Sequence, residues 1–139
     1  FEAALDKDGI AYKEYAIADT NEVQSVTTAA AGECDVLYIP TDNTLASVTE
    51  TVYNVVAPAK IPVIAGEEGI CNGCGVATLS ISYYDLGYAT GEMAYEILAE
   101  GADITTMDVR YAPNVTKKYN AKICEELGIT VPDDYVAIQ

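Results

Sequence analysis

The stretch Asp35-Val-Leu-Tyr-Ile-Pro-Thr-Asp-Asn-Thr44 decides the fold class of this chain. Its segment Val36–Ile39 is short and wholly apolar, as expected of a central parallel strand that is covered on both faces. Thr41, Asp42 and Asn43 follow at once, where a helical pattern begins. In open α/β sheets, small molecules bind outside the carboxyl ends of the strands. The stretch therefore predicts a strand that ends at a ligand crevice.

The first half of the chain alternates between strand and helix patterns. The strand patterns are Ile10–Ile17, Val36–Ile39 and Ile61–Ala65, and the helix patterns run from Asn21 to Gly32 and from Thr44 to Ala57. Valines recur at helical spacing in the second helix pattern, and Pro58 is expected to end it. The resulting β-α-β-α-β order is typical of a Rossmann-like α/β fold, with a parallel sheet flanked by helices.

The second half of the chain opens with a change in residue composition. Residues Gly66–Gly75 are rich in Gly, Glu and Cys without any hydrophobic period, so we expect a loop there. The remaining expected elements are a strand at Val76–Ser82, a helix at Tyr84–Glu100, a short strand at Asp108–Tyr111 and a helix at Thr116–Leu127.

Length and charge limit the kinds of molecule that the chain can bind. The chain has 139 residues, enough for one domain, and carries 22 acidic against 7 basic residues for a net charge of −15. Such a charge repels phosphate backbones and anionic membrane surfaces, so nucleic acid is a poor partner for this chain. No segment approaches the roughly 20 apolar residues of a membrane span.

The start of the chain has the composition of a helix end. Residues Phe1–Gly9 include no initiating Met and no signal peptide, and they close on a glycine, which commonly terminates helices. We therefore expect the sequence to be a piece of a longer protein.

Four cysteines are present at positions 34, 71, 74 and 124, and only Cys71 and Cys74 are close in sequence. A C-x-x-C pair is compatible with structural thiols, a local disulfide, a redox motif or half of a zinc site. The redox motif is expected at a helix start after a strand, and the chain has no histidine to complete a zinc site. The role of Cys71 and Cys74 stays open at this point.

The polar residues after Val36–Ile39 have two interpretations. An Asp or Asn before a helix is the ordinary N-cap, which needs only one such residue. Three polar residues stand here, and this favours ligand contact. Asp42 could pair with a ligand ammonium, while Thr41 and Asn43 could donate to a carboxylate. Such a set suits a zwitterion.

A second polar strand end is expected at Ser82 and Tyr83, again directly before a helix. Tyr83 could stack on a ligand or could instead pack in the core. Glu67 and Glu68 form an adjacent acidic pair in the expected loop, either as solvated charges or as a ligand contact.

Catalytic signatures are mostly missing, since there is no histidine, G-x-S-x-G, P-loop or G-x-G-x-x-G motif. We expect no enzyme, no cofactor and no metal site. The alternative is a flavodoxin-like signalling or receiver domain with Asp42 as the phosphoacceptor. That alternative needs further acids and a lysine around Mg²⁺, which the sequence does not place convincingly.

Five phrases of the chain resemble the substrate-binding proteins of ABC importers, in the family that includes receptors for tryptophan and related aromatic amino acids. They are Asn21-Glu-Val-Gln24, the stretch from Asp35 to Thr44, Ile61-Pro-Val-Ile64, the stretch from Ala77 to Gly87, and Leu127-Gly-Ile-Thr-Val-Pro132. Together they span nearly the whole chain, and Pro-Thr-Asp-Asn and Tyr-Tyr-Asp-Leu-Gly are the specific ones.

The resemblance implies a type I periplasmic-binding fold, in which two Rossmann-like lobes close on a ligand at the hinge. By comparison, residues 1–65 are expected to form a βαβαβ unit of the second lobe and residues 66–75 the crossing between lobes. Residues 76–139 are then strand and helix elements that return to the first lobe, with a C-terminal tail. The N-terminal lobe, and with it half of the cleft, is expected to be missing.

The resemblance also implies a set of ligand-binding residues. It matches Thr41, Asp42 and Asn43 to the strand-end site of the family, and Glu67 to a position where related receptors place a polar contact. Tyr83 matches an aromatic residue at the crossing, whereas Ser82 departs from the acidic residue expected before it.

We therefore expect a fragment of an extracytoplasmic receptor, which in full length is a cell-surface lipoprotein or a periplasmic protein. It is expected to bind an aromatic or branched amino acid and to deliver it to an ABC permease that reads the closed form. Without its N-terminal lobe, the fragment is expected to expose apolar surface and to self-associate.

Overall fold

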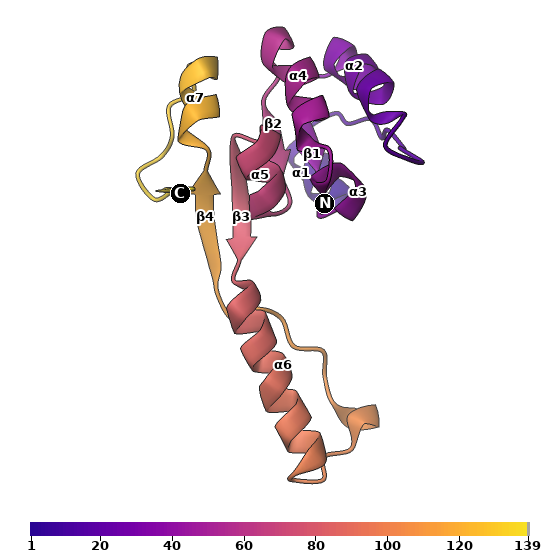
Figure 1. The fold of residues 1–139 in the computed structure, drawn as a ribbon, viewed down its shortest axis with the longest axis vertical. Coiled ribbons are helices and arrows are strands. Elements are labelled where there is room, and N and C mark those ends of the chain that lie inside the picture. The colour runs from indigo at the N-terminus through magenta and orange to yellow at the C-terminus, as the bar shows by residue number, and fades with distance from the viewer. Residues whose placement is uncertain (139) are drawn as a thin grey trace.

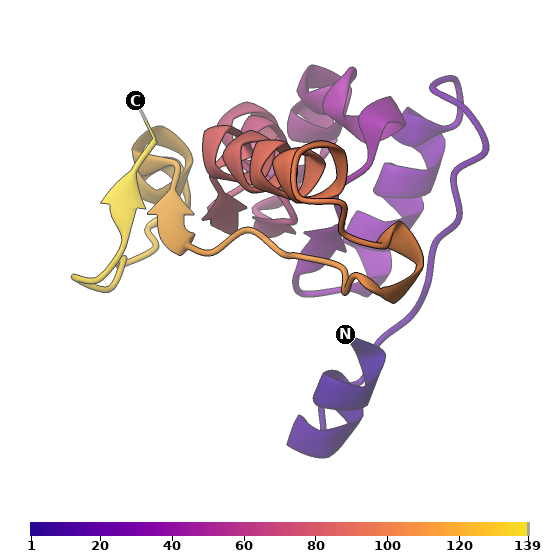
Figure 2. The same ribbon diagram turned by 90° about the horizontal axis from the view of Figure 1, so that it is seen from below.

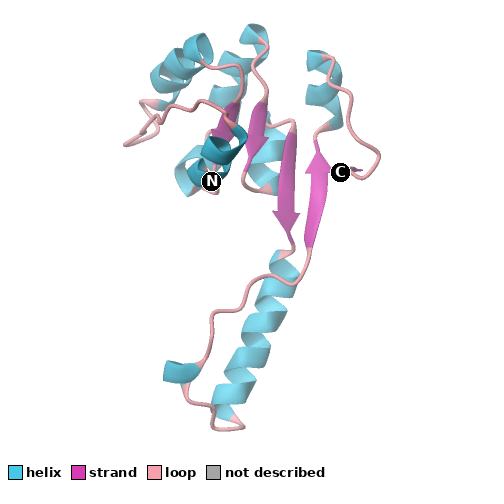
Figure 3. Ribbon diagram, turned by 180° about the vertical axis from the view of Figure 1, so that it is seen from behind, coloured by secondary structure: helices cyan, strands magenta, loops and turns pink. Residues whose placement is uncertain are grey.

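The computed structural model describes residues 1–138, which form a five-stranded sheet with helices packed on it (Figures 1 and 3). The strands are β1 (Leu37–Ile39), β2 (Val63–Ala65), β3 (Ala77–Ile81), β4 (Val115–Tyr119) and β5 (Val136–Ala137), and they lie in the sheet in chain order. β1, β2 and β3 run parallel, whereas β4 is antiparallel to β3. The predicted α/β class is confirmed, and the sheet is mixed rather than wholly parallel.

The helices lie between the strands along the chain. They are α1 (Glu2–Asp8), α2 (Val23–Glu33), α3 (Asn43–Ala46), α4 (Thr49–Ala59), α5 (Glu68–Cys74), α6 (Tyr83–Leu98) and α7 (Ala121–Leu127), with a 3₁₀ turn, η1, at Ile104–Thr106. α4 packs against both α2 and α5, and α5 lies on β2 and β3. α1 lies on the other side of the sheet from α4 and α5 (Figure 2).

The hydrophobic core lies between the sheet and the helices α2, α4 and α5. In β2, Val63 and Ala65 are buried, whereas Ile64 between them is exposed. This alternation follows from the strand period of two, which points successive side chains to opposite faces. Val23 of α2 and Ile70 of α5 close the core, and both are fully buried.

The opposite face of the sheet is open in residues 1–138. Tyr38 of β1, Ile64 of β2 and Leu79 of β3 share this face and are 42%, 38% and 58% exposed. Phe1 stacks on Tyr38 with 4.1 Å between the ring centroids. The sequence predicts a parallel strand covered on both faces, and the described residues cover mainly one of them.

Helix α6 projects away from the sheet, and residues 99–114 return beside it to β4 (Figure 1). None of its side chains is buried, and Leu98 at its end is 85% exposed. An amphipathic helix of this length normally depends on packing its apolar face for stability. Within residues 1–138, α6 leaves that face largely open.

Two predicted strands are wrong. Ile10–Ile17 and Asp108–Tyr111 have no regular secondary structure. Strand-like side chains do not suffice, because a strand also needs a neighbour for its backbone N–H and C=O groups. Neither segment has such a neighbour among the described residues.

The loop predicted at Gly66–Gly75 is also wrong, because this segment contains α5. The carboxylate of Glu67 accepts hydrogen bonds from the backbone N–H groups of Gly69 and Ile70, which satisfies free donors of the first turn. Ile70 and Cys74 then bury the same face of the helix.

The single helix predicted at Thr116–Leu127 is wrong in its first part. Val115–Tyr119 forms β4, and α7 starts only after Asn120, whose side chain accepts a hydrogen bond from Ile123 N at 3.2 Å. The cap separates a strand from a helix within one continuous apolar pattern.

The helix predicted at Thr44–Ala57 is split into α3 and α4, because Val48 leaves helical conformation with a φ of −135°. Pro58 lies inside the last turn of α4 instead of ending it, and the cap residue Lys60 after the helix is in the left-handed region (φ 56°). The predicted helices between Asn21 and Gly32 and after Ser82 are confirmed as α2 and α6. So is the helix that closes on Gly9 (φ 70°).

Candidate functional site

The predicted site residues gather at one edge of the sheet. Because β1, β2 and β3 are parallel, their carboxyl ends meet at the same edge. The residues follow these strands in order, with Thr41, Asp42 and Asn43 after β1, Glu67 after β2, and Ser82 and Tyr83 after β3. We call this row of residues the strand-end site.

At the end of β1, the side chain of Asp42 caps a helix. Its Oδ1 accepts a hydrogen bond from Leu45 N at 2.8 Å, at the start of α3. Asp42 is half-buried, and Asn43 beside it is exposed. The Thr41 hydroxyl donates to the carbonyl oxygen of Gly66 at 3.2 Å, which ties the end of β1 to the end of β2. Asp42 therefore caps α3 with one of its two carboxylate oxygens.

At the end of β2, Glu67 and Glu68 have different partners. Glu67 caps α5, and one of its oxygens accepts from Gly69 N at 2.7 Å. Oε2 of Glu68 accepts from the Ser80 hydroxyl at 2.9 Å and from Lys118 Nζ at 2.7 Å. The hydrogen bond from Lys118 lowers the pKa of Glu68 against the opposing effect of its partial burial. Neither acid is a free surface charge.

At the end of β3, Ser82 and Tyr83 open α6. The Ser82 hydroxyl oxygen accepts from Asp85 N at 3.1 Å and caps the helix. Tyr83 is 62% exposed, so the alternative of a core side chain is wrong within the described residues. Both residues line a hollow of about 290 Å³, which we call the Lys118 hollow. Its wall also includes Glu68, Ser80, Thr116 and Lys118.

Sequence reasoning missed Ser80 and Lys118. Ser80 is 4% exposed and belongs to the polar strand end that holds Ser82. Lys118 could not be assigned to the site from the sequence, because the sequence predicts a helix over the residues that form β4. The pairing of β4 with β3 places Lys118 opposite Thr78, beside this site. Residues 115–119 show no alternation of apolar and polar side chains that would have indicated a strand.

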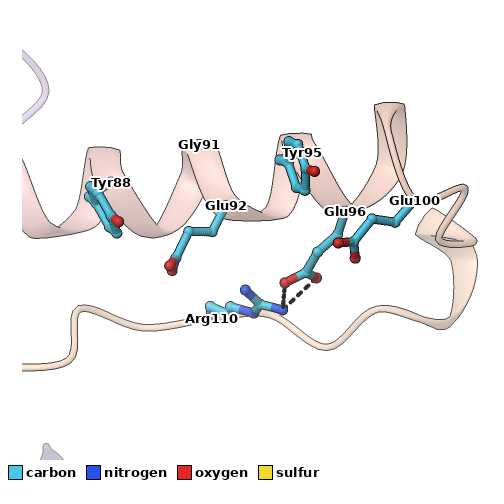
Figure 4. A pocket seen from close by; sticks show the side chains of 7 residues that line it. All are labelled: Tyr88, Gly91, Glu92, Tyr95, Glu96, Glu100 and Arg110. Atoms are coloured by element: carbon cyan, nitrogen blue, oxygen red, sulfur yellow. Dashed lines mark hydrogen bonds and ion pairs between the residues drawn. The ribbon is translucent and has the colours of Figure 1, made fainter.

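A second hollow of about 670 Å³ lies along α6 (Figure 4). Arg110, on the returning segment, donates from Nη2 to both carboxylate oxygens of Glu96 at 2.8 and 2.6 Å. This pair raises the pKa of Arg110 further. Tyr88 and Glu92 line the hollow as well, and none of the strand-end residues does.

The cysteines are free thiols throughout residues 1–138, and Cys71 and Cys74 are buried in α5. Burial raises the pKa of both thiols to about 12, whereas redox motifs need a lowered pKa and access to solvent. The structure therefore supports the interpretation as structural thiols. No group of three or more metal-ligating side chains is placed to hold an ion within this part of the chain.

Thiol titration should separate the cysteines. At pH 8, a thiol with a pKa of about 12 is ionised in roughly one molecule in 10⁴, so Cys71 and Cys74 should resist a disulfide reagent in the native chain. We expect half-buried Cys34 to react promptly and the others only in urea. Prompt reaction of two or more thiols in the native chain would contradict the buried placement.

The geometry defines a class of protein: a Rossmann-like lobe that gathers polar side chains at the carboxyl edge of its parallel strands. A family model described as ABC transporter substrate binding protein matches residues 1–138. The chain therefore belongs to the ABC transporter substrate-binding protein family, and the predicted resemblance is confirmed. This is a family of transport proteins rather than a class of enzyme.

One relative is the tyrosine-binding protein of Clostridioides difficile (strain R20291). It is 40% identical to the chain over 100 residues, which cover 68% of this chain and 29% of that protein.

Solved structures also match. A ligand-free, open substrate-binding protein with adhesive properties from Clostridium difficile is 35% identical, with a TM-score of 0.74 over 99% of this chain and 48% of that one. An ABC domain from Streptococcus pneumoniae in complex with L-Trp is 31% identical, with a TM-score of 0.87 over 100% and 49%. A conserved domain protein from Vibrio cholerae is 30% identical, with a TM-score of 0.86 over 99% and 48%. The chain thus spans about half the length of these structures.

Proposed function

We propose that the chain is one part of the substrate-binding component of an ABC importer. The observation that carries this proposal is the convergence of three polar strand ends at one edge of the sheet in a chain of this family. The component binds an amino acid between two lobes and delivers it to a permease without chemical change. Membership of this family argues against the alternative of a receiver domain with Asp42 as the phosphoacceptor.

The ligand is an aromatic amino acid in this proposal. Two relatives are described with tyrosine and with L-Trp. The ends of β1 and β3 are two interstrand spacings apart, roughly 10 Å. A ligand that contacts both must be long, which favours an aromatic over a branched amino acid.

The strand-end site supplies the contacts. Asp42 offers the oxygen that does not cap α3 to the ligand ammonium, and Thr41 and Asn43 orient the polar end of the ligand. Tyr83, exposed at the end of β3, covers the aromatic part. Glu67 and Ser82 keep their caps and border the cleft.

The other wall of the cleft comes from a second lobe. We place the crossing between lobes at Ser82 and again near Asn114, rather than at residues 66–75, because α5 packs on the same sheet as β1 and β2. Helix α6 and residues 99–114 then belong to the other lobe. Its remaining elements would cover the open face of α6.

The proposed location is outside the cytoplasm, as for substrate-binding proteins of ABC importers, with a lipid anchor on the full-length protein. In the described part of the chain, no helix has both the length and the apolar character needed to span a bilayer. Sequencing the coding region upstream of Phe1 tests the anchor, because it should encode a lipoprotein signal followed by an α/β lobe.

Calorimetry of the full-length receptor tests the function. We expect one aromatic amino acid to bind in a one-to-one complex and to raise the midpoint of thermal unfolding. Branched amino acids and nucleotides serve as controls and should give less heat or none. Absence of heat and of a thermal shift with every aromatic amino acid would refute the proposal.

The isolated chain should self-associate. Leu79 and Ile64 lie on an open sheet face, and large exposed apolar patches on soluble proteins usually mark interaction surfaces. Light scattering should show species larger than a monomer for the 139-residue chain, and fewer of them for Leu79→Lys. A clean monomer at high concentration would show that the open face does not drive association.

A further inference from the structure

The Lys118 hollow contains a charged pair that the strand-end site does not use. Glu68, the first residue of α5, reaches Ser80 of β3 and Lys118 of β4 with the same oxygen, Oε2. Ser80 is 4% exposed, so its hydrogen bond anchors the carboxylate of Glu68 to a buried position of β3. Lys118 is the only cation among the described residues that line this hollow.

The pair keeps unused hydrogen-bonding capacity. An ammonium group has three protons, and Glu68 takes one from Lys118 at 2.7 Å. Within residues 1–138, Oε1 of Glu68 accepts no hydrogen bond, since both of its side-chain contacts go to Oε2. The hollow therefore holds one donor and one acceptor side by side, and Tyr83 and the end of β3 line it as well.

A ligand hydroxyl matches this pair. A hydroxyl can donate to the free oxygen of Glu68 and accept from Lys118 at the same time. Both side chains are half-buried. An aromatic ring without a hydroxyl would remove the remaining water from both charges without replacing its hydrogen bonds, which costs free energy.

Strand spacing places such a hydroxyl in reach. If Asp42 holds the ligand ammonium after β1, the aromatic side chain runs along the sheet edge toward β3, roughly 10 Å away. The tip of the side chain, past Tyr83, then lies at the Lys118 hollow.

We propose that the Lys118 hollow receives the hydroxyl of a 4-hydroxyphenyl amino acid, so that Glu68 and Lys118 make the receptor prefer tyrosine over phenylalanine. This inference rests on the proposed function, because it assumes that the strand-end site binds an amino acid.

Calorimetry of the full-length receptor with tyrosine and phenylalanine tests the inference, in the unchanged protein and in Glu68→Gln, Lys118→Met and Lys117→Met. Lys117 is the matched control, because it neighbours Lys118 but pairs with Asp134 outside the hollow. We expect the unchanged receptor to bind tyrosine at least about tenfold more tightly than phenylalanine. Lys118→Met should bring that ratio close to one by weakening tyrosine alone. Glu68→Gln should lower the ratio, because a neutral amide oxygen accepts more weakly than a carboxylate, and Lys117→Met should leave it unchanged.

Two results would overturn the inference while leaving the proposed function intact. One is equal affinity of the unchanged receptor for tyrosine and phenylalanine. The other is an equal loss of both ligands in Lys118→Met, which would assign the pair to the ligand head group or to folding; a normal unfolding midpoint of the variant would exclude folding. Failure of the unchanged receptor to bind any aromatic amino acid would instead refute the proposed function, and this inference with it.

Discussion

Asp42→Ser in the full-length receptor is expected to weaken aromatic amino acid binding by about 2–4 kcal/mol, roughly 30- to 700-fold in affinity. The variant removes the carboxylate that we assign to the ligand ammonium and leaves that cation without its partner. It keeps the helix cap, since serine accepts hydrogen bonds at the N-cap as well as aspartate does. Calorimetry measures the affinity, and thermal unfolding measures the stability, which should stay nearly unchanged.

Asp42→Ala is the matched control, because it loses both the charge and the bond from Leu45 N. We expect the same loss of affinity as for Asp42→Ser, together with about 1 kcal/mol lost from the free energy of unfolding. If Asp42→Ser instead binds as tightly as the unchanged receptor, Asp42 is a helix cap and nothing more.

The strand-end site could be predicted because its signals are local. A short apolar run followed by Thr41, Asp42 and Asn43 indicates a strand that ends in polar groups, whatever the rest of the chain does. Parallel pairing then brings the ends of β1, β2 and β3 together. The structure confirms the strands, and the ligand roles of these residues stay a prediction.

The partners of Glu68 could not be predicted, because they depend on pairing between distant segments. Tyr119, Ile123 and Leu127 recur every four residues, so the junction between β4 and α7 reads as one helix. Residues 115–119 become a strand because β3 is available beside them. Ile10–Ile17 shows the converse, since it has strand-like residues and no strand to pair with among residues 1–138.

Helix α5 was hidden by its glycines, which lower helix propensity and resemble a loop. Gly73 is required by packing, because a Cβ there would lie 2.4 Å from the Cβ of Thr49 in α4. Close approach of α4 and α5 therefore selects a residue that local propensity rejects. The N-cap at Glu67 supplies part of the compensating stability.

Gly66→Ala is expected to lower the free energy of unfolding of the chain by about 1–3 kcal/mol, as overpacking of a tight contact does. A Cβ at Gly66 would lie 2.6 Å from Thr41 N and 2.8 Å from Pro40 C, which are backbone atoms that cannot rotate away. The ends of β1 and β2 would have to separate. That movement strains the bond from Gly66 N to Ile39 O at 2.7 Å and displaces Thr41 from the strand-end site.

Urea denaturation measures the loss, and Gly32→Ala is the control. Gly32 lies in α2, and among residues 1–138 an added Cβ would meet nothing within 4 Å outside its own helix backbone and chain neighbours, so alanine there should stabilise the helix by roughly 0.5–1 kcal/mol. In the full-length receptor, Gly66→Ala should also weaken ligand binding, because Thr41 and Asp42 move with the end of β1. Equal stability of Gly66→Ala and the unchanged chain would mean that the two strand ends are not in close contact, and the strand-end site would lose the geometry on which its assignment depends.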